Sequence, residues 1–140
     1  MKKTSKLLFL DDVRNVEDAF SYTGMDIYTK VPDLWDVVRN FNDFVKYIEN
    51  KGIPQLISFD HDLAPEHYRE SMYAEDKRYN KYYTDGTFKE KTGYDCAKWL
   101  VDYCTNNNAK IPIVTCHSMN PIGKENILKV LNEGKSRLNK

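Results

Sequence analysis

Residues 7–12 read LLFLDD, so that four apolar residues lead directly into two acidic ones. The same order recurs at residues 56–62, which read LISFDHD, and a third apolar run leads into TCHSMN at residues 115–120. Short apolar runs of this kind are typical of strands that are buried on both faces of a parallel sheet. Because ligands of open α/β sheets gather at the carboxyl ends of the strands, we expect the polar residues after the three runs to lie together.

Three further segments carry apolar residues at helical spacing and have polar or glycine residues at their ends. The expected helices run from Asn40 to Gly52, from about Gly93 to the asparagines at 106–108, and from Asn120 to Gly134. A strand is expected near residues 34–38, and the residues after Gly134 are expected to fray. Strands that alternate with helices predict an α/β domain with a doubly wound, parallel, four-stranded sheet. A length of 140 residues fits one domain over residues 1–140.

Residues 63–90 do not fit this alternation of strands and helices. A connection of that length is unusual and often functional, and this one holds five tyrosines and a phenylalanine among many charges. One interpretation is a lid whose aromatic rings stack on a base or ribose. The other is a satellite hairpin or helix, with residues 66–81 as the helical part, that packs its tyrosines on the rest of the domain.

Bulk composition narrows the function classes. The 21 basic residues balance the 21 acidic ones, so composition gives no support for an extended nucleic-acid surface. No apolar stretch approaches the ~20 residues that a membrane crossing needs. The 3 cysteines are an odd number without metal-ligand spacing, which favours a reduced, cytoplasmic setting. Cys96 and Cys104 fall on one helical face and are interpreted as core residues.

The carboxylates at the strand ends are the first candidates for chemistry. A single aspartate after a strand often only caps the next helix, but Asp11, Asp12, Asp60 and Asp62 are too many for capping alone. Like charges that lie together raise one another's pKa unless a cation separates them. Clustered carboxylate oxygens suit hard divalent cations. We therefore expect Asp11, Asp12 and Asp60 to hold a divalent metal ion, Mg²⁺ or Mn²⁺.

Two histidines and Asp62 accompany these carboxylates as candidate catalytic residues. His117 follows the last strand, where it could bind metal, transfer a proton, contact a phosphate or be an ordinary hydrogen-bonded histidine. His61 lies between two aspartates. In an extended chain it points away from them and is a core or supporting group, whereas in a turn it could be a ligand. Asp62 is either a further ligand or the group that orients a histidine.

Three residues are candidates for holding a phosphate. Arg14 follows the first acidic pair and could clamp phosphate oxygens, although a surface pair with Asp18 is the alternative. Ser118 and Asn120 precede a helix whose free N–H groups could bind an anion. Asn120 is also a good N-cap for that helix.

Several short motifs in this order carry a resemblance to a known family. They are LDDVR at residues 10–14, Trp35, Val38-Arg39, SFDHDL at residues 58–63, GYD at residues 93–95 and HSMNPIG at residues 117–123. Together they resemble the cyclic-phosphate-processing receiver-like domains, which are divergent relatives of response-regulator receivers. The resemblance implies a receiver-like, flavodoxin-like three-layer sandwich over nearly the whole chain.

The same resemblance implies a hydrolase that processes cyclic phosphates, either nucleotides or the 2′,3′-cyclic ends of RNA. Its partner would be a phosphate-containing small molecule or an RNA end. Asp11, Asp12 and Asp60 then match the acidic pair and the phospho-acceptor of ordinary receivers. The strand-five lysine of those receivers finds no counterpart here. His61, Asp62 and His117 stand at the strand ends instead, which favours hydrolysis over phosphotransfer signalling.

Other interpretations of these motifs remain open. The pocket could bind a nucleotide or a partner protein without turnover, or Asp60 could accept a phosphoryl group as in a signalling receiver. The order of Asp60, His61 and Asp62 after a strand is also similar to haloacid-dehalogenase-like phosphatases. The lysine and acidic motifs that such phosphatases carry downstream are not found in the rest of the chain.

Overall fold

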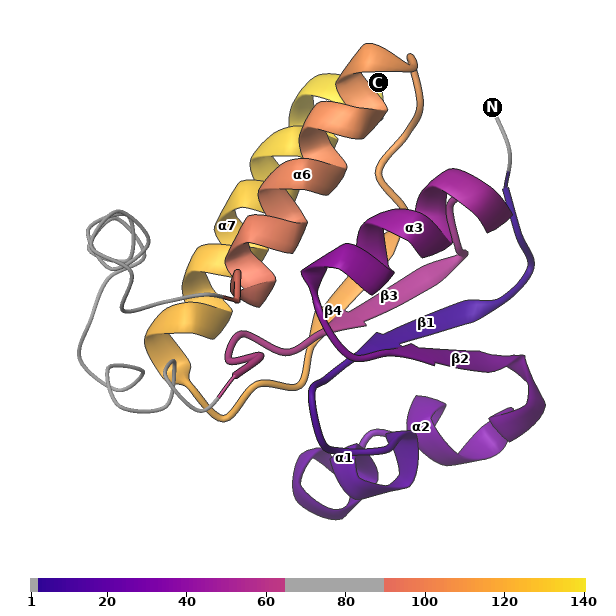
Figure 1. Cartoon of the computed structure of the whole chain (residues 1–140), viewed down its shortest axis with the longest axis vertical. Coiled ribbons are helices and arrows are strands. Elements are labelled where there is room, and N and C mark those ends of the chain that lie inside the picture. Colours follow the sequence, from indigo (N-terminus) through magenta and orange to yellow (C-terminus); the bar gives the residue numbers. More distant parts are fainter. Residues whose placement is uncertain (1–2, 65–89) are drawn as a thin grey trace.

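The computed structural model describes residues 3–64 and 90–140, and Figure 1 shows how their elements are arranged. The strands of this described part are β1 (Leu7–Leu10), β2 (Trp35–Val38), β3 (Leu56–Phe59) and β4 (Ile113–Cys116). Its helices are α1 (Val16–Thr23), α2 (Ile27–Lys30), the 3₁₀ turn η1 (Pro32–Leu34), α3 (Phe41–Lys51), α6 (Gly93–Asn106) and α7 (Pro121–Leu138). The sequence therefore predicted all four of these strands and the three long helices correctly.

The four strands form one parallel sheet in the order β2-β1-β3-β4. Leu10 pairs with both Val38 and Phe59, and Phe59 pairs with Cys116, so the strands end level with one another. This register brings the residues that follow β1, β3 and β4 to one edge of the sheet. The fold is the expected α/β receiver-like fold, with an all-parallel sheet and helices on both faces.

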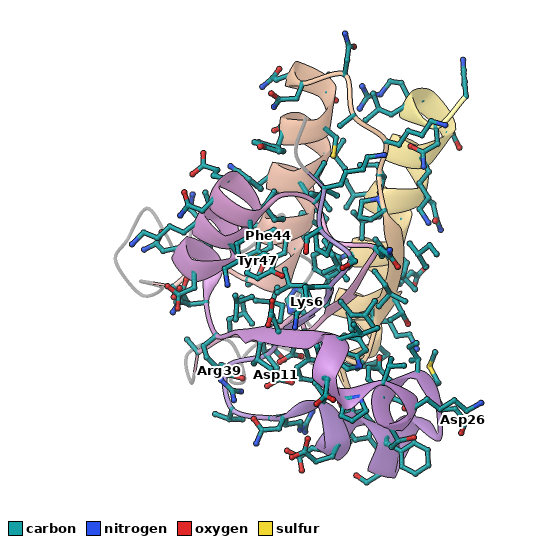
Figure 2. All side chains as sticks on the ribbon, turned by 90° about the vertical axis from the view of Figure 1, so that its right-hand side faces the viewer. Lys6, Asp11, Asp26, Arg39, Phe44 and Tyr47 are labelled. Carbon is teal, nitrogen blue, oxygen red and sulfur yellow. The ribbon has the colours of Figure 1, made fainter. Side chains whose placement is uncertain are left out.

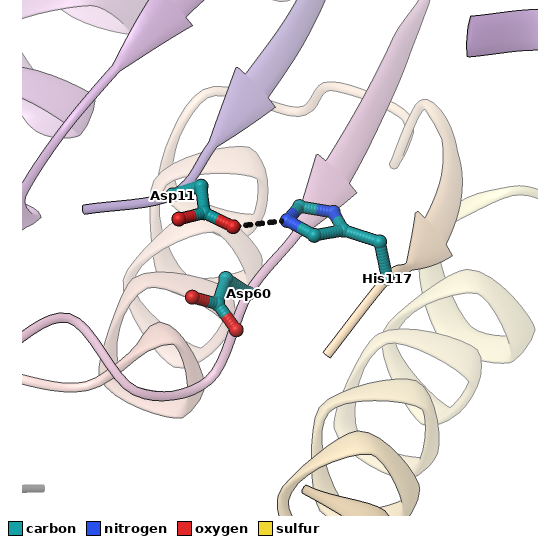
Figure 3. Close-up of side chains that lie close together, drawn as sticks. All are labelled: Asp11, Asp60 and His117. Carbon is teal, nitrogen blue, oxygen red and sulfur yellow. Dashed lines mark hydrogen bonds and ion pairs between the residues drawn. The ribbon is translucent and has the colours of Figure 1, made fainter. Parts of the chain in front are cut away.

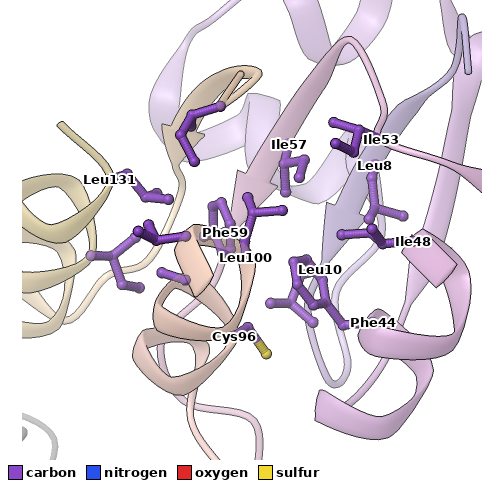
Figure 4. Close-up of a cluster of buried hydrophobic side chains, with 14 of the residues drawn as sticks. Leu8, Leu10, Phe44, Ile48, Ile53, Ile57, Phe59, Cys96, Leu100 and Leu131 are labelled. Atoms are coloured by element: carbon purple, nitrogen blue, oxygen red, sulfur yellow. The ribbon is translucent and has the colours of Figure 1, made fainter. Parts of the chain in front are cut away.

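Alternation along β1 separates two apolar cores. Leu8 and Leu10 belong to the larger core, which α3, α6 and α7 cover (Figure 4). Leu7 and Phe9 point to the other face, where α1, α2 and Trp35 form a smaller core. Cys96, Cys104 and Cys116 are free and buried, which confirms Cys96 and Cys104 as core residues.

The helix caps predicted at Asn40, Gly52 and Asn120 are present in the structure. The Asn40 side chain accepts a hydrogen bond from the Asp43 N–H at 2.9 Å, and Gly52 ends α3 at a φ of 103°. The Asn120 side chain likewise accepts from the Gly123 N–H at 3.0 Å and so caps α7. These caps fix where α3 and α7 begin relative to the sheet edge.

Two predictions about helices need correction. Gly134 does not end the last helix, because α7 continues to Leu138 and the tail to that residue is helical rather than frayed. A Cβ at Gly134 would lie 3.0 Å from Val101 Cγ2, so glycine serves the close packing of α7 on α6. The helices α1 and α2 were also not expected, and Gly24 caps α1 at a φ of 68°.

An insert is predicted over residues 63–90, either as an aromatic lid or as a packed hairpin or helix. Almost all of it falls on residues 65–89, which lie outside the described part. Leu63 and Ala64, which are described, are buried against the domain. Among the described helices, none is long and apolar enough to cross a membrane.

Candidate functional site

Asp11, Asp60 and His117 each stand one residue beyond the end of a strand. The ladder of the sheet continues through them, because Asp11 N–H donates to Val38, Asp60 N–H to Leu10 and His117 N–H to Phe59, all through backbone carbonyls at 3.0–3.1 Å. The backbone thus fixes all three side chains in one register at the carboxyl edge (Figure 3). The expected convergence of these three residues is confirmed.

Asp11 is fully buried and strongly hydrogen-bonded. Its Oδ1 accepts from the backbone N–H groups of Val13 at 3.0 Å and Arg14 at 2.8 Å, and its Oδ2 lies 3.0 Å from His117 Nε2. Burial acts to raise the pKa of Asp11, but the hydrogen bonds from His117 and the two backbone groups outweigh it and leave the pKa below its ordinary value. Asp11 is therefore an ionised carboxylate held in a fixed direction.

His117 lies in a box of aromatic and hydroxyl groups. Its ring stacks on Phe9 with 4.1 Å between centroids, and its Nδ1 lies 2.7 Å from the Ser58 hydroxyl. Ser58 Oγ in turn lies 2.7 Å from the Tyr28 hydroxyl. Burial lowers the pKa of His117, while Asp11 opposes this shift, and the net direction is downward.

A neutral ring in this box has one consistent pattern of hydrogen bonds. An ionised Asp11 can only accept, so His117 carries its proton on Nε2 and donates to Asp11 Oδ2. Its Nδ1 then accepts from Ser58, and Ser58 can accept from Tyr28. The chain Tyr28–Ser58–His117–Asp11 thus runs from the smaller core to the edge of the sheet.

Asp60 is the destabilised member of the cluster. It is buried, and the hydrogen bond that its Oδ1 accepts from the His61 N–H at 2.9 Å offsets little of the cost of ionisation. Burial, followed by the charges of Asp11, Asp62 and Asp12, raises its pKa well above the ordinary value. A cation beside Asp60 would lower this pKa, because its positive charge would offset the negative charges of these neighbours.

One donor atom from each of Asp11, Asp60 and His117 lies within 4.8 Å of the other two, so these residues could hold a metal ion. Carboxylate oxygens and an imidazole nitrogen fit a divalent cation, and the negative charges of Asp11, Asp62 and Asp12 around Asp60 favour a positive charge there. Asp12 is half-buried beside them and outside that group of three, although its charge acts on Asp60.

His61 and Asp62 are not among the three residues of the possible metal site. His61 is buried, with Nδ1 2.8 Å from Asp62 Oδ1 and 3.3 Å from Asn120 Nδ2. Its carbonyl accepts from the Gly93 N–H at 2.7 Å, and a Cβ on Gly123 would lie 2.4 Å from its ring. His61 therefore packs between the first turns of α6 and α7, as the interpretation of a supporting group expected.

The three candidate phosphate contacts have distinct surroundings. The Arg14 guanidinium donates to Tyr22 Oη at 3.3 Å and to Met119 Sδ at 3.2 Å. Asp18, its alternative partner, instead accepts from the Asn15 N–H within the cap of α1. Ser118 Oγ accepts from the Asn120 N–H at 3.1 Å, so Ser118 and Asn120 both shape the turn into α7.

Sequence reasoning missed Arg39 as a structural part of this site. Its guanidinium donates to the carbonyls of Asp11 at 3.2 Å and Arg14 at 2.5 Å and to the Asn15 side chain at 2.6 Å. Figure 2 shows Arg39 close to Asp11 at the ends of neighbouring strands. The position of Arg39 in the sequence could have pointed to this role, because Arg39 directly follows β2, which pairs with β1.

Ser58 and Tyr28 were also missed as partners of His117. Ser58 is a single hydroxyl inside the apolar run of β3, two residues before Asp60, and it is fully buried. A polar residue in such a run needs a partner, which is a signal that the sequence does contain. Tyr28 comes from α2, a four-residue helix whose packing the sequence pattern does not reveal.

Comparison with known proteins agrees with this geometry. A family model described as "Cyclic-phosphate processing Receiver domain" matches residues 6–133, which include the whole of the described site. A search of curated proteins found no matching relative. The chain belongs to the cyclic-phosphate processing receiver domain family.

Proposed function

We propose that this protein is a metal-dependent phosphoesterase that opens cyclic phosphates, with nucleoside 2′,3′-cyclic phosphates or RNA 2′,3′-cyclic ends as its substrates. The observation that carries the proposal is the buried cluster of Asp11, Asp60 and His117 at the carboxyl edge of the sheet. The family to which the chain belongs supports the same class of substrate. Asp11 and Asp60, with Asp12 beside them, would hold a Mg²⁺ or Mn²⁺ ion. Such an ion, when bound, polarises a phosphoryl oxygen and acidifies a water molecule.

Ring opening requires little more than these groups. One water adds to phosphorus, the P–O bond to one sugar oxygen breaks, and that oxygen takes up a proton. His117 is the proposed acid or base, with its mobile proton at Nε2 and its ring fixed by Ser58. His61, oriented by Asp62, is the second candidate for this proton transfer. Arg14, Ser118 and Asn120 are the proposed contacts to phosphate oxygens.

Turnover of adenosine 2′,3′-cyclic monophosphate with Mg²⁺ or Mn²⁺, followed by ³¹P NMR, tests the proposal. We expect ring opening by the parent protein and a loss of at least a hundredfold in Asp60→Asn and His117→Ala. Asp26→Asn is the matched control, because Asp26 is an exposed carboxylate that pairs with Lys30 at 3.4 Å. Equal rates for the parent and the two site variants would refute the assignment.

Two rival functions give different results in the same material. A binding module would retain the cyclic nucleotide without opening it. A signalling receiver would form an acyl-phosphate on Asp60, which intact mass after treatment with acetyl phosphate would detect. The signalling receiver is tested because Asp60 directly follows a strand and lies beside an acidic pair.

A further inference from the structure

A hollow of about 430 Å³ lies beside the cluster, between the end of α1 and the turn from β4 into α7. Its lining includes Tyr22, Met25 and Met119, together with Lys124 and His117. Pockets for small molecules typically measure about 300–1,000 Å³. A larger hollow of about 540 Å³ lies at the opposite ends of the strands, but its lining contains no carboxylate or imidazole.

Part of the wall of the hollow beside the cluster is made of three exposed apolar side chains. Tyr22, Met25 and Met119 are 38%, 42% and 62% exposed, and they are three of the eight large apolar side chains exposed in the described part of the chain. Exposed apolar groups that gather around a cavity often mark a binding surface. Tyrosine and methionine present polarisable faces of the kind that contact a planar ring.

Arg14 joins this apolar wall to the acidic cluster. Its guanidinium lies 5.0 Å from the centre of the Tyr22 ring and also contacts Met119 Sδ. The charges of Asp11 and Asp60 act on the same guanidinium, and the backbone N–H of Arg14 donates to Asp11. A ligand whose phosphate lies at the cluster would therefore pass Arg14 before it reaches the hollow.

We propose that this hollow, which we call the Tyr22–Met119 subsite, binds the nucleoside part of the substrate, with the base against Tyr22 and Met119. This inference rests on the proposed function and adds the part of the molecule that recognises the base, so that cyclic phosphates of bare sugars should bind less well. The position of Lys124 in the lining, together with Arg14, supplies positive charge that suits a phosphate-bearing ligand.

The test compares two stable phosphate monoesters, adenosine 2′-monophosphate and the base-free methyl riboside 2-phosphate. Methionine methyl groups labelled with ¹³C report contact directly by NMR. We expect adenosine 2′-monophosphate to shift the methyl signals of Met25 and Met119, and the base-free ester to leave both unchanged. Equal shifts with both esters, or no shift with either at saturation, would overturn the subsite.

Variants sharpen the comparison. Met119→Ala should weaken binding of adenosine 2′-monophosphate roughly tenfold and leave the base-free ester unaffected, because stacking acts on the base alone. Met119→Leu, which keeps an apolar contact, should recover most of the affinity. Phe20→Ala is the control, because Phe20 is also an exposed apolar side chain, on α1, but does not line the hollow. An equal loss for both esters in Met119→Ala would also contradict the proposal.

Failure of the subsite and failure of the catalytic proposal are distinguishable. If ring opening proceeds equally well on the base-free cyclic phosphate, the phosphoesterase stands and the subsite falls. If no cyclic phosphate is opened, the methyl shifts still decide whether a nucleotide occupies the hollow.

Discussion

Among the single residues of the site, Asp60 has the least favourable surroundings for an ionised side chain. Its pKa is raised well above its ordinary value of 3.8, first by burial and then by the charges of Asp11, Asp62 and Asp12. Ionisation of Asp60 in the folded chain therefore opposes folding unless a cation is present. Binding residues commonly lower stability in this way, since the geometry that suits a ligand is strained without it.

The first prediction follows from this cost of ionising Asp60. In the presence of a chelator, Asp60→Asn should be more stable than the parent by about 1–2 kcal/mol at neutral pH. Urea unfolding of both proteins measures this difference. Mn²⁺ should stabilise the parent by about 2.7 kcal/mol at a hundredfold excess over its Kd and should stabilise Asp60→Asn far less. A variant that is less stable than the parent without metal would contradict the account.

The pH dependence of that difference has a defined sign. Asp60 has a folded pKa above its unfolded value, so its protonated form favours folding at low pH, and this contribution is lost as pH rises toward the folded pKa. The advantage of Asp60→Asn should therefore be small below pH 3.8 and grow above it. Asp11 has a lowered pKa, so its contribution to stability is fully present above its ordinary pKa and is lost as pH falls through the folded value. Unfolding midpoints in chelator across this pH range measure both trends.

The hydroxyl pair behind His117 gives a further prediction. Tyr28→Phe and Ser58→Ala should each cost about 1–2 kcal/mol of stability, because each leaves a buried polar partner unsatisfied. In the proposed reaction both should lower kcat more than they raise KM, since they orient His117 without touching substrate. Tyr47→Phe is the control, because the Tyr47 hydroxyl bonds to Asp36 instead. Equal kcat in Tyr28→Phe and Tyr47→Phe would exclude a positioning role for Tyr28.

Glycines set the geometry at the scale of elements. A Cβ on Gly93, the first residue of α6, would lie only 1.7 Å from the Asp60 carbonyl oxygen. The Gly93 N–H also donates to the His61 carbonyl, so α6 begins directly beneath the end of β3. The first turn of α6 thus supports the backbone that presents Asp60.

Gly93→Ala should therefore destabilise the protein by more than about 3 kcal/mol, because backbone rather than a side-chain tip must move. Gly24→Ala is a matched comparison. Gly24 has a φ of 68°, but no other atom lies within 4 Å of the position that a Cβ would take, so its substitution should cost about 1 kcal/mol. Urea unfolding of the two variants separates a steric clash from backbone strain, and equal losses would show that the close approach at Gly93 is unimportant.

Elements with long apolar patterns were predictable from the sequence, and short polar ones were not. α3, α6 and α7 each bury a stripe of apolar residues at helical spacing, whereas α1 buries only Val16 and Ala19. Gly134 was misinterpreted because a glycine late in a helix fits both a C-cap and a close helix contact, and only the position of Val101 decides between them. Strand ends were predicted well, since apolar runs stop where the carboxylates begin.

The candidate site depends on the whole molecule. Parallel pairing alone predicted that Asp11, Asp60 and His117 would meet, and this follows from the level strand ends. The sequence could not place His61, because its role depends on how α6 and α7 pack around it. Likewise, the two helices on the smaller core decide that Tyr28 reaches Ser58, and their packing is a tertiary property.

The extension of the sheet ladder through Asp11, Asp60 and His117 has a consequence for folding kinetics. Asp11 and His117 are separated by 106 positions in the chain, and their contact closes only when β4 has joined β3. Contacts of such long range form late, because the entropy of the intervening chain must be lost first. A partly folded chain without β4 therefore brings Asp11 and Asp60 together but lacks the imidazole of His117 beside them. In refolding, ring opening should return only with the final kinetic phase, so a newly made chain that has bound the ion is inactive until β4 is in place.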